Sequence, residues 1–235
     1  RWALEAVLAD VRARQISRMV NLGDCVYGPL DPAGTLEILM ELDIPTVRGN
    51  QDRIVATPDE TDLPSHTLRF VLDSVGEDGA AWLGGLPLTL SIDGELLLCH
   101  GTPEHDDRYL VWSVSTDEVA LRTPEELSAT LAGVSERVIL CGHSHVPRKI
   151  SLPDGRMVVN PGSVGLPAYA DEEPYPHVME ARNPHARYAI LQRDGGEWQV
   201  EHVAVSYDYR VAVEAALENE RPDWAEWLGS GRAQL

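Results

Sequence analysis

Two histidines follow a buried-strand pattern in the middle of the chain. The apolar run Val138-Ile139-Leu140-Cys141 leads directly into Gly142-His143-Ser144-His145. If the run is a strand of an open α/β sheet, these residues leave it at the carboxyl end, where such sheets build their sites. Positions i and i+2 of an extended segment point the same way, so His143 and His145 are expected to face one spot. Because neutral imidazole is a common metal ligand, the pair indicates either a metal site or a chance pair of loop histidines.

Three more polar residues follow predicted strands. They are Asp24, Asn50 and His100, which come after the strands expected at 18–22, 44–47 and 96–99, in that order. Taken alone, Asp24 is better interpreted as an ordinary turn residue than as a ligand. The repeated order of strand, polar turn and helix predicts a sheet whose loops gather at one edge, and five such residues at one edge favour a metal site.

Helices and strands are expected to alternate in a single domain that covers residues 1–235. Apolar residues at helical spacing predict helices at 4–11, 36–42 and 79–86, and Pro124 opens another. The further strands expected are 86–92 and two hairpins, 150–152 with 157–159 and 188–191 with 198–205.

Two segments lie outside this alternation. Residues 166–186 form a long, acidic stretch punctuated by prolines, which predicts a long surface loop, either a lid over the substrate or a mobile stretch. Residues 208–235 read as a helical tail that is broken at Arg221-Pro222.

The composition is strongly acidic. Lys and Arg total 19 against 38 Asp and Glu, which gives a net charge of −19. Such a surface repels nucleic-acid backbone, so a nucleic-acid polymer is an unfavourable partner. The uncharged run at 79–92 contains too few residues to span a bilayer, and three cysteines without framework spacing suit a reducing compartment, so the expected location is the cytoplasm.

The motifs, taken in order, resemble those of the calcineurin-like metallophosphoesterase superfamily, particularly its small bacterial members. The matching segments are Asp24-Cys25-Val26-Tyr27-Gly28, Arg48-Gly49-Asn50-Gln51-Asp52, Cys99-His100-Gly101, Gly142-His143-Ser144-His145 and Asn160-Pro161-Gly162-Ser163. The resemblance implies an α/β fold, a four-layer αββα sandwich of two mixed sheets flanked by helices. It also implies a two-metal centre in which Asp24 bridges both ions, Asn50, His100 and His143 complete one shell, and His145 binds the other ion.

The chemistry implied is metal-dependent hydrolysis of a phosphomonoester or phosphodiester in a small phosphorylated substrate. Two cations roughly 3.5–4 Å apart can generate a bridging hydroxide and clamp the phosphate oxygens, so no protein nucleophile is needed. The mixed nitrogen and oxygen ligands suit Mn, Fe, Zn or Ni better than Mg. The catalytic set is then Asp24, Asn50 and His143, with Asn50 and Arg53 as candidate contacts to substrate phosphate. A salt bridge on this acidic surface is the more economical interpretation of Arg53.

The sequence departs from the family pattern in two places. Family members open with a strand that ends in Asp-x-His, and this strand is expected upstream of Arg1. Gln51 stands where many members carry a histidine that protonates the leaving group, and an amide cannot act as a general acid. His105 is the first candidate for a replacement acid because it closely follows His100, with His66 and His177 behind it. Asp52 is expected either to orient a ligand or to be an exposed loop residue.

The sequence also bears on functions other than hydrolysis. A catalytically weak metal-binding or regulatory protein on the same fold is the alternative that Gln51 supports. A serine hydrolase is excluded because the turn Pro161-Gly162-Ser163-Val164-Gly165 lacks the first glycine of a nucleophile elbow. No Gly-x-Gly-x-x-Gly follows a strand, which excludes the common dinucleotide fingerprint.

Overall fold

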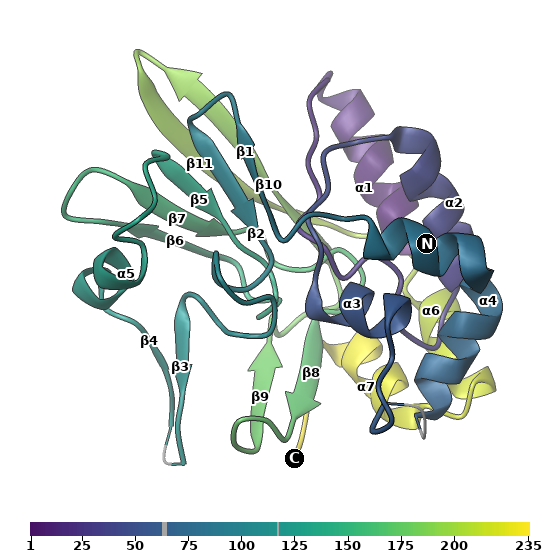
Figure 1. The fold of residues 1–235 in the computed structure, drawn as a ribbon. Coiled ribbons are helices and arrows are strands. Elements are labelled where there is room, and N and C mark those ends of the chain that lie inside the picture. Colours follow the sequence, from purple (N-terminus) through teal and green to yellow (C-terminus); the bar gives the residue numbers. More distant parts are fainter. Residues whose placement is uncertain (63–64, 117) are drawn as a thin grey trace.

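The computed structural model describes residues 1–62, 65–116 and 118–235 (Figure 1). Its helices are α1 (Trp2–Ala13), α2 (Pro32–Leu42), α3 (Asn50–Ala56), α4 (His66–Gly84), α5 (Pro124–Thr130), α6 (Arg210–Glu218) and α7 (Pro222–Ser230). Its strands are β1 (Thr89–Ile92), β2 (Leu96–Cys99), β3 (Trp112–Val114), β4 (Val119–Leu121), β5 (Val138–Leu140), β6 (Arg148–Ser151), β7 (Met157–Asn160), β8 (Ala168–Asp171), β9 (His177–Glu180), β10 (Ala186–Asp194) and β11 (Glu197–Val205).

A mixed five-stranded sheet forms the centre of the fold, in the order β1-β2-β5-β7-β6. The pairs β2–β5 and β5–β7 are parallel, whereas the edge strands β1 and β6 pair antiparallel to their neighbours. All three residues of β5 are buried, as expected for a strand that is covered on both faces. The sheet therefore carries its parallel strands in the middle, and their carboxyl ends point to one edge.

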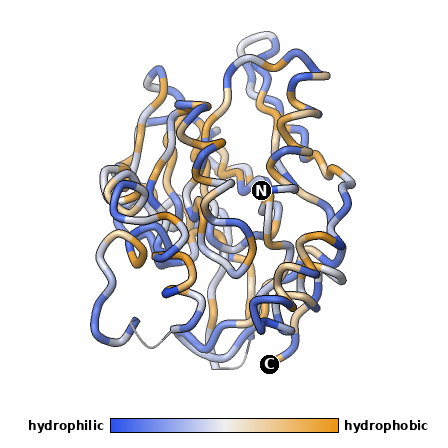
Figure 2. The backbone as a smooth tube through the Cα atoms, turned by 90° about the vertical axis from the view of Figure 1, so that its right-hand side faces the viewer, coloured by the Kyte–Doolittle hydropathy of each residue, from blue (hydrophilic) through white to orange (hydrophobic). Residues whose placement is uncertain are grey.

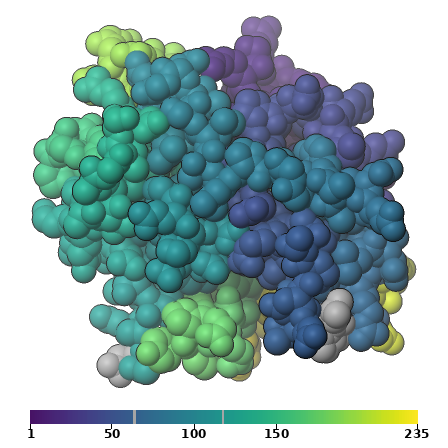
Figure 3. Space-filling model, in the orientation of Figure 1, coloured from purple at the N-terminus to yellow at the C-terminus, as the bar shows by residue number. Residues whose placement is uncertain are grey.

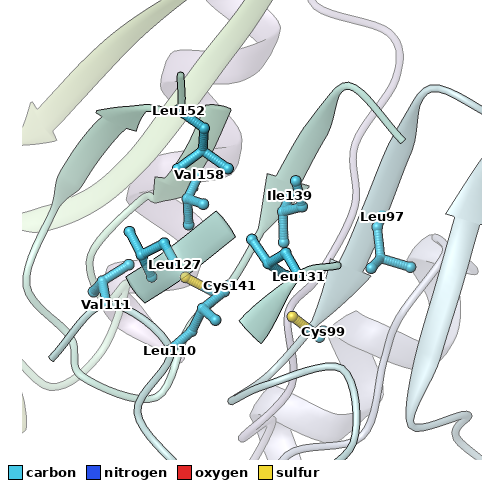
Figure 4. Packing of buried hydrophobic residues seen from close by; sticks show 10 residues of the cluster. All are labelled: Leu97, Cys99, Leu110, Val111, Leu127, Leu131, Ile139, Cys141, Leu152 and Val158. Carbon is cyan, nitrogen blue, oxygen red and sulfur yellow. The ribbon is translucent and has the colours of Figure 1, made fainter. Parts of the chain in front are cut away.

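The two faces of the sheet pack against different elements. Side chains alternate along β5, so Ile139 joins one apolar cluster while Val138 and Leu140 join another. Figure 4 shows the first cluster, in which Leu127 and Leu131 lie against the sheet. Leu127 belongs to α5, which starts with Pro124 and a capping box between Thr123 and Glu126. This helix therefore covers one face.

The opposite face packs against the long β10–β11 ribbon. Side chains of the ribbon, Trp198 and Val200 among them, contact the cluster that contains Val138 and Leu140. On its far side the ribbon packs against α1, whose Val7 and Val11 are buried. The layers thus follow the order α5, sheet, ribbon and α1, and apolar segments fill the middle of the chain trace in Figure 2.

The mixed α/β class that the sequence predicts is confirmed, and the structure differs from it in detail. The second sheet is not mixed: in the described residues it is the antiparallel β10–β11 pair. The strands expected at 18–22 and 44–47 are wrong, because a single parallel bridge between Asn21 and Thr46 is all that joins these two segments. Extended backbone leads to the site there, but no regular ladder forms.

Helix boundaries also differ from expectation. The segment 48–52 is not wholly a loop, because α3 starts at Asn50. The helix expected at 79–86 is the last part of α4, which bends at Gly76, where φ is +64°. The helical tail is confirmed as α6 and α7, with the break at Arg221.

The long surface loop expected at 166–186 is wrong. This segment contains β8 and β9, which pair in antiparallel register from Ala168 with Glu180 to Asp171 with His177. Tyr169 and Met179 form one of the inner pairs, and Met179 is buried. The prolines lie outside the two strands, so they shape the ends of a hairpin without breaking its ladder.

None of the helices in the described part of the chain is long and apolar enough to cross a membrane.

Candidate metal centre

Two neighbouring parallel strands deliver two of the predicted ligands to one place. β2 ends just before His100, and β5 ends shortly before His143. The register pairs Leu98 with Leu140, and beyond the ladder the Gly142 amide donates to the His100 carbonyl at 2.7 Å. As a result the rings of His100 and His143 lie edge to face with centroids 5.2 Å apart.

Asp24 completes a compact group with these two histidines. One ligand atom from each of Asp24, His100 and His143 can be chosen so that all lie within 4.8 Å of one another. His100 Nε2 lies 3.1 Å from Asp24 Oδ2. Residues far apart in the sequence thus place one carboxylate and two imidazoles around a common point, which is a donor set for a divalent metal.

Gly49 allows the chain to pass close to Asp24. A Cβ atom on Gly49 would overlap the Asp24 carboxylate and would lie 2.6 Å from the Asp24 backbone nitrogen. The residue that follows, Asn50, is the first residue of α3, and the amide of Gln51 donates to Asp24 Oδ1 at 3.0 Å. The start of α3 therefore lies directly against the carboxylate.

Asp52 holds the Asp24 turn close to Gly49 through hydrogen bonds to the backbone. Its buried carboxylate accepts three backbone N–H groups, those of Asp24, Cys25 and Gly49, each at 2.8 Å. Burial and the charge of Asp24 raise the pKa of Asp52 to about 6, against the lowering effect of these backbone donors. Asp52 is therefore a buried residue that holds the Asp24 turn against the start of α3, and the interpretation as an exposed loop residue is wrong.

Three of the five predicted ligands adopt an unusual backbone conformation. Asp24, His143 and His145 have φ angles of +56°, +63° and +56°, in the left-handed region that non-glycine residues seldom adopt. The extended backbone expected at His143 and His145 is therefore wrong, because both residues turn. Strain of this kind is typical of sites where the surroundings fix a side chain in place.

The titration behaviour of the group follows from burial and from the single carboxylate. Burial lowers the pKa of His143 to about 3, helped by the nearby His100, and lowers that of His145 to about 4. Burial acts in the same direction on His100, but the charge of Asp24 outweighs it and raises the pKa of His100 to about 9. Burial acts to raise the pKa of Asp24, but His100 outweighs it and the pKa falls to about 2.

Unpaired buried atoms test whether these residues fit a metal. Among the described residues, the buried side-chain atoms without a hydrogen bond include Asn50 Oδ1, His100 Nε2 and His145 Nδ1. All three belong to predicted ligands. His100 Nδ1 lies 2.6 Å from the Leu22 carbonyl and must donate to it, so in the neutral ring Nε2 presents a lone pair to an Asp24 oxygen. Two acceptors this close require a cation between them, either a proton or a metal ion, and the residues therefore fit a metal.

His145 and Asn50 lie beside the compact group. His145 is close enough to Asp24 and His100 for their charges to act on its pKa. Both residues also line the cavity of about 1030 Å³ onto which Asp24, His100 and His143 open. Its walls come from the sheet, the ribbon and α1.

Two of the predicted residues do not join the group. Arg53 forms an ion pair with the buried Asp106 at 3.0 Å and a second with Asp107 at 3.5 Å, so the salt-bridge alternative for Arg53 is the one observed. His105 lines a separate pocket of about 260 Å³ together with Arg48 and Arg53, and it is absent from the lining of the larger cavity.

Three residues around the histidines were not predicted as part of the site. Tyr109 stacks on the His143 ring at 4.5 Å, and Tyr169 packs edge-on against the His145 ring at 4.8 Å. His177, for which the sequence suggests only a role as proton donor, has its Nε2 2.8 Å from the Tyr109 hydroxyl oxygen. No spacing in the sequence connects Tyr109, Tyr169 and His177 with the histidines. Tyr169 and His177 reach the site through the pairing of β8 with β9, which the sequence did not predict.

Similar proteins share this architecture over nearly the full chain. An uncharacterized protein of Methanocaldococcus jannaschii, MJ0912, is 27% identical over 98% of this chain and 93% of its own. The crystal structure of a metallophosphoesterase from Sphaerobacter thermophilus superposes with a TM-score of 0.75 at 22% identity, covering 98% of this chain and 95% of that one. A hypothetical protein from Pyrococcus horikoshii gives the same TM-score at 20% identity, covering 99% and 94%.

The family assignment follows from a match to the calcineurin-like phosphoesterase superfamily domain, which extends over residues 1–183. The match includes every predicted ligand and the β8–β9 hairpin up to Glu180. The chain therefore belongs to the calcineurin-like phosphoesterase superfamily.

Proposed function

We propose that this protein is a metal-dependent phosphoesterase that hydrolyses a phosphomonoester or phosphodiester bond at the candidate metal centre. The observation that carries the proposal is the approach of His100 Nε2 to Asp24 Oδ2 at 3.1 Å, with His143 in the same group. A buried pair of facing acceptors is costly unless a cation lies between them.

The ligands would divide between two ions. Asp24, Asn50, His100 and His143 would hold one of them, and Asp24 with His145 would contribute to the other. Imidazole and carboxylate donors together favour Mn, Fe, Zn or Ni over Mg. Bound divalent ions would supply the Lewis acidity that polarises a phosphoryl oxygen and lowers the pKa of an attacking water.

Asn50 is proposed to bind the metal ion and to contact the substrate. Its Oδ1 is buried without a hydrogen bond, so this oxygen would serve the ion, while the amide nitrogen would be the donor for a phosphate oxygen. The helix start holds Asn50 against Asp24, because the neighbouring amide of Gln51 donates to that carboxylate. Arg53 is not proposed as a substrate contact, since its guanidinium is paired with Asp106 and Asp107.

The range of substrates is limited by the lack of a side chain placed to protonate the leaving group among Gln51 and His105. Gln51 lines the cavity beside the ligands and cannot donate a proton as a general acid, and His105 lies in the separate pocket. We propose that the reaction favours small phosphorylated substrates with a good leaving group. A net charge of −19 disfavours nucleic-acid polymers, and the cytoplasm is the proposed location.

A second candidate function is a metal-binding regulatory protein with weak catalysis. Gln51 is the observation that favours it, because the position where many family members carry a proton donor holds an amide.

The test is hydrolysis of an activated aryl phosphate and its diester counterpart by metal-stripped protein, with Mn, Fe, Zn, Ni or Mg restored one at a time. Turnover that returns with metal and is lost in His143→Ala supports the phosphoesterase, and the ratio of monoester to diester rates identifies the substrate class. Tight metal binding without turnover on either substrate favours the regulatory alternative.

A further inference from the structure

A chain of hydrogen bonds leads from the β8–β9 hairpin to the backbone of His143. The Tyr169 hydroxyl donates to the His143 carbonyl at 3.0 Å. The Tyr109 and Tyr169 hydroxyl oxygens lie 2.7 Å apart, and the Tyr109 oxygen lies 2.8 Å from His177 Nε2. His177 Nδ1 ends the chain, 2.8 Å from the Tyr175 carbonyl.

The same residues contact the histidine rings. Tyr109 stacks on His143, and Tyr169 packs edge-on against His145. Tyr109 and His177 are buried, with 8% and 3% of their surface exposed. The rings of Tyr109 and Tyr169 thus each pack against the ring of a predicted ligand. Their hydroxyls belong to the chain of hydrogen bonds that ends at the His143 carbonyl.

We propose that Tyr169, Tyr109 and His177 are positioning residues that hold His143 in its left-handed conformation, so that the β8–β9 hairpin is part of the metal centre. The inference rests on the proposed function for its catalytic consequence. A residue at φ +63° needs contacts that over-determine its backbone, and the hydrogen bond to its carbonyl is one of them. No protein group in the chain reacts; each orients the next.

Counting protons shows how the chain is completed. A carbonyl oxygen can only accept a hydrogen bond, so the Tyr169 hydroxyl donates its proton to the His143 carbonyl. The Tyr109 hydroxyl must then donate to the Tyr169 hydroxyl oxygen. His177 Nε2 must in turn donate to Tyr109, while Nδ1 donates to the Tyr175 carbonyl. All four hydrogen bonds form together only when His177 carries protons on both nitrogens, and a neutral His177 costs one of them.

The residues around His177 include one carboxylate. Asp171 is its cross-strand partner on β8, on the same face as Tyr169. Burial, together with the charge of Asp171, raises the pKa of both tyrosines above the usual value, so both hydroxyls keep their protons. Val146 and Met179 pack in the same cluster, and the Arg148 guanidinium lies over its Trp112 ring at 4.8 Å from the ring centroid.

One end of the hairpin lies at the surface. Figure 3 shows residues near its end, in light green, at the lower edge of the molecular surface, and Tyr175 is 42% exposed. Phenylalanine at position 169 or 109 keeps the ring contact and removes the hydroxyl alone. Tyr188→Phe is the matched control, because its hydroxyl donates to Asp10 on α1 instead.

The first experiment measures amide exchange in metal-free protein at Gly142 and Ser144, whose amides are hydrogen-bonded in the structure. Tyr169→Phe is expected to speed exchange at these amides about fivefold, the effect of one lost hydrogen bond, and Tyr188→Phe to leave it unchanged. Cobalt(II) titration followed by absorption should give about tenfold weaker binding in Tyr169→Phe. Equal values for the two variants in both measurements would overturn the proposal.

Rescue by a conservative variant separates positioning from simple packing. His177→Gln keeps an N–H donor for the Tyr109 hydroxyl, so its amide exchange at Gly142 and Ser144 should match that of the wild type. His177→Leu fills similar space without a donor, and its exchange should speed up as in Tyr169→Phe. Equal exchange in the two His177 variants would contradict the hydrogen-bond chain.

The two proposals fail in different ways. Absence of phosphoester hydrolysis in the wild type, with the exchange response intact, rejects the phosphoesterase and leaves the positioning chain in place. Hydrolysis that is unchanged in Tyr169→Phe, together with unchanged exchange, rejects the chain and leaves the phosphoesterase.

Discussion

Asp24 Oδ2 and His100 Nε2 lie 3.1 Å apart, and His100 Nδ1 donates a hydrogen bond to the Leu22 carbonyl. The carbonyl fixes the ring so that Nε2 points at the carboxylate. The pair therefore shares one cation, and a proton and a metal ion compete for the same place.

Metal binding should release a proton. At pH 7 His100 is protonated because its pKa is raised to about 9, whereas the lowered pKa values of His143, His145 and Asp24 leave those groups ready to bind. We expect release of about one proton per ion at pH 7 and an affinity that rises about tenfold per pH unit up to pH 9. Calorimetry in buffers of different ionisation enthalpy measures this, and binding without proton release would contradict it.

Asp52→Asn should loosen the Asp24 turn. An amide cannot accept the three backbone N–H groups that the carboxylate accepts, so buried donors lose their partner. We expect a loss of about 3 kcal/mol in the free energy of unfolding and weaker metal binding. Asp154→Asn, at an exposed turn, is the control and should change neither quantity in denaturant titration and metal titration.

Gly49→Ala should disturb the site through sterics alone. The new Cβ atom would overlap the Asp24 carboxylate and approach the Asp24 backbone, which cannot move without shifting the turn. Metal affinity is expected to fall about tenfold or more, as for a displaced ligand. In Gly133→Ala nothing lies within 4 Å of the added atom, and its metal titration should match the wild type.

Gln51→His should extend the substrate range. A histidine at this position lines the cavity beside the ligands and can protonate a leaving group, which Gln51 cannot do. We expect kcat for an alkyl phosphate to rise about a hundredfold and kcat for an activated aryl phosphate to change little. Equal effects on both substrates would argue against the assignment of position 51 to leaving-group chemistry.

Arg53→Met should reduce stability without affecting substrate binding. Arg53 pairs with Asp106, which is nearly buried, so its removal leaves that carboxylate with only Arg48 at 3.6 Å. We expect a loss of about 2 kcal/mol in the free energy of unfolding with KM unchanged. A large rise in KM would instead restore Arg53 as a contact to substrate phosphate; Arg18→Met removes an exposed ion pair with Asp93 and is the control.

The sequence predicted those parts of the fold that depend on local patterns. The buried strands at 96–99 and 138–140 follow from short apolar runs, and α5 follows from its proline and capping residues. The ligand positions after these strands follow from the parallel order, and the structure brings Asp24, His100 and His143 together.

The parts that the sequence did not predict depend on contacts between distant segments. The segment 18–22 reads as a strand, but its backbone meets residues 44–47 at one bridge only. The β8–β9 hairpin has an acidic, proline-rich sequence, and it packs against Tyr109 as well as against α7, contacts that a local pattern does not reveal. The left-handed backbone at His143 likewise reflects tertiary contacts, because no residue type in Gly142-His143-Ser144-His145 requires it.

The parallel pairing of β2 with β5 has a consequence for how this protein can change during evolution. The Gly142 amide bonds the His100 carbonyl whatever the length of chain between the two strands. Once the chain has passed Tyr109, the β3–β4 hairpin and α5 form a connection that contributes no predicted ligand. Insertions and exchanges in this connection can therefore remodel this part of the surface while the predicted ligands keep their positions.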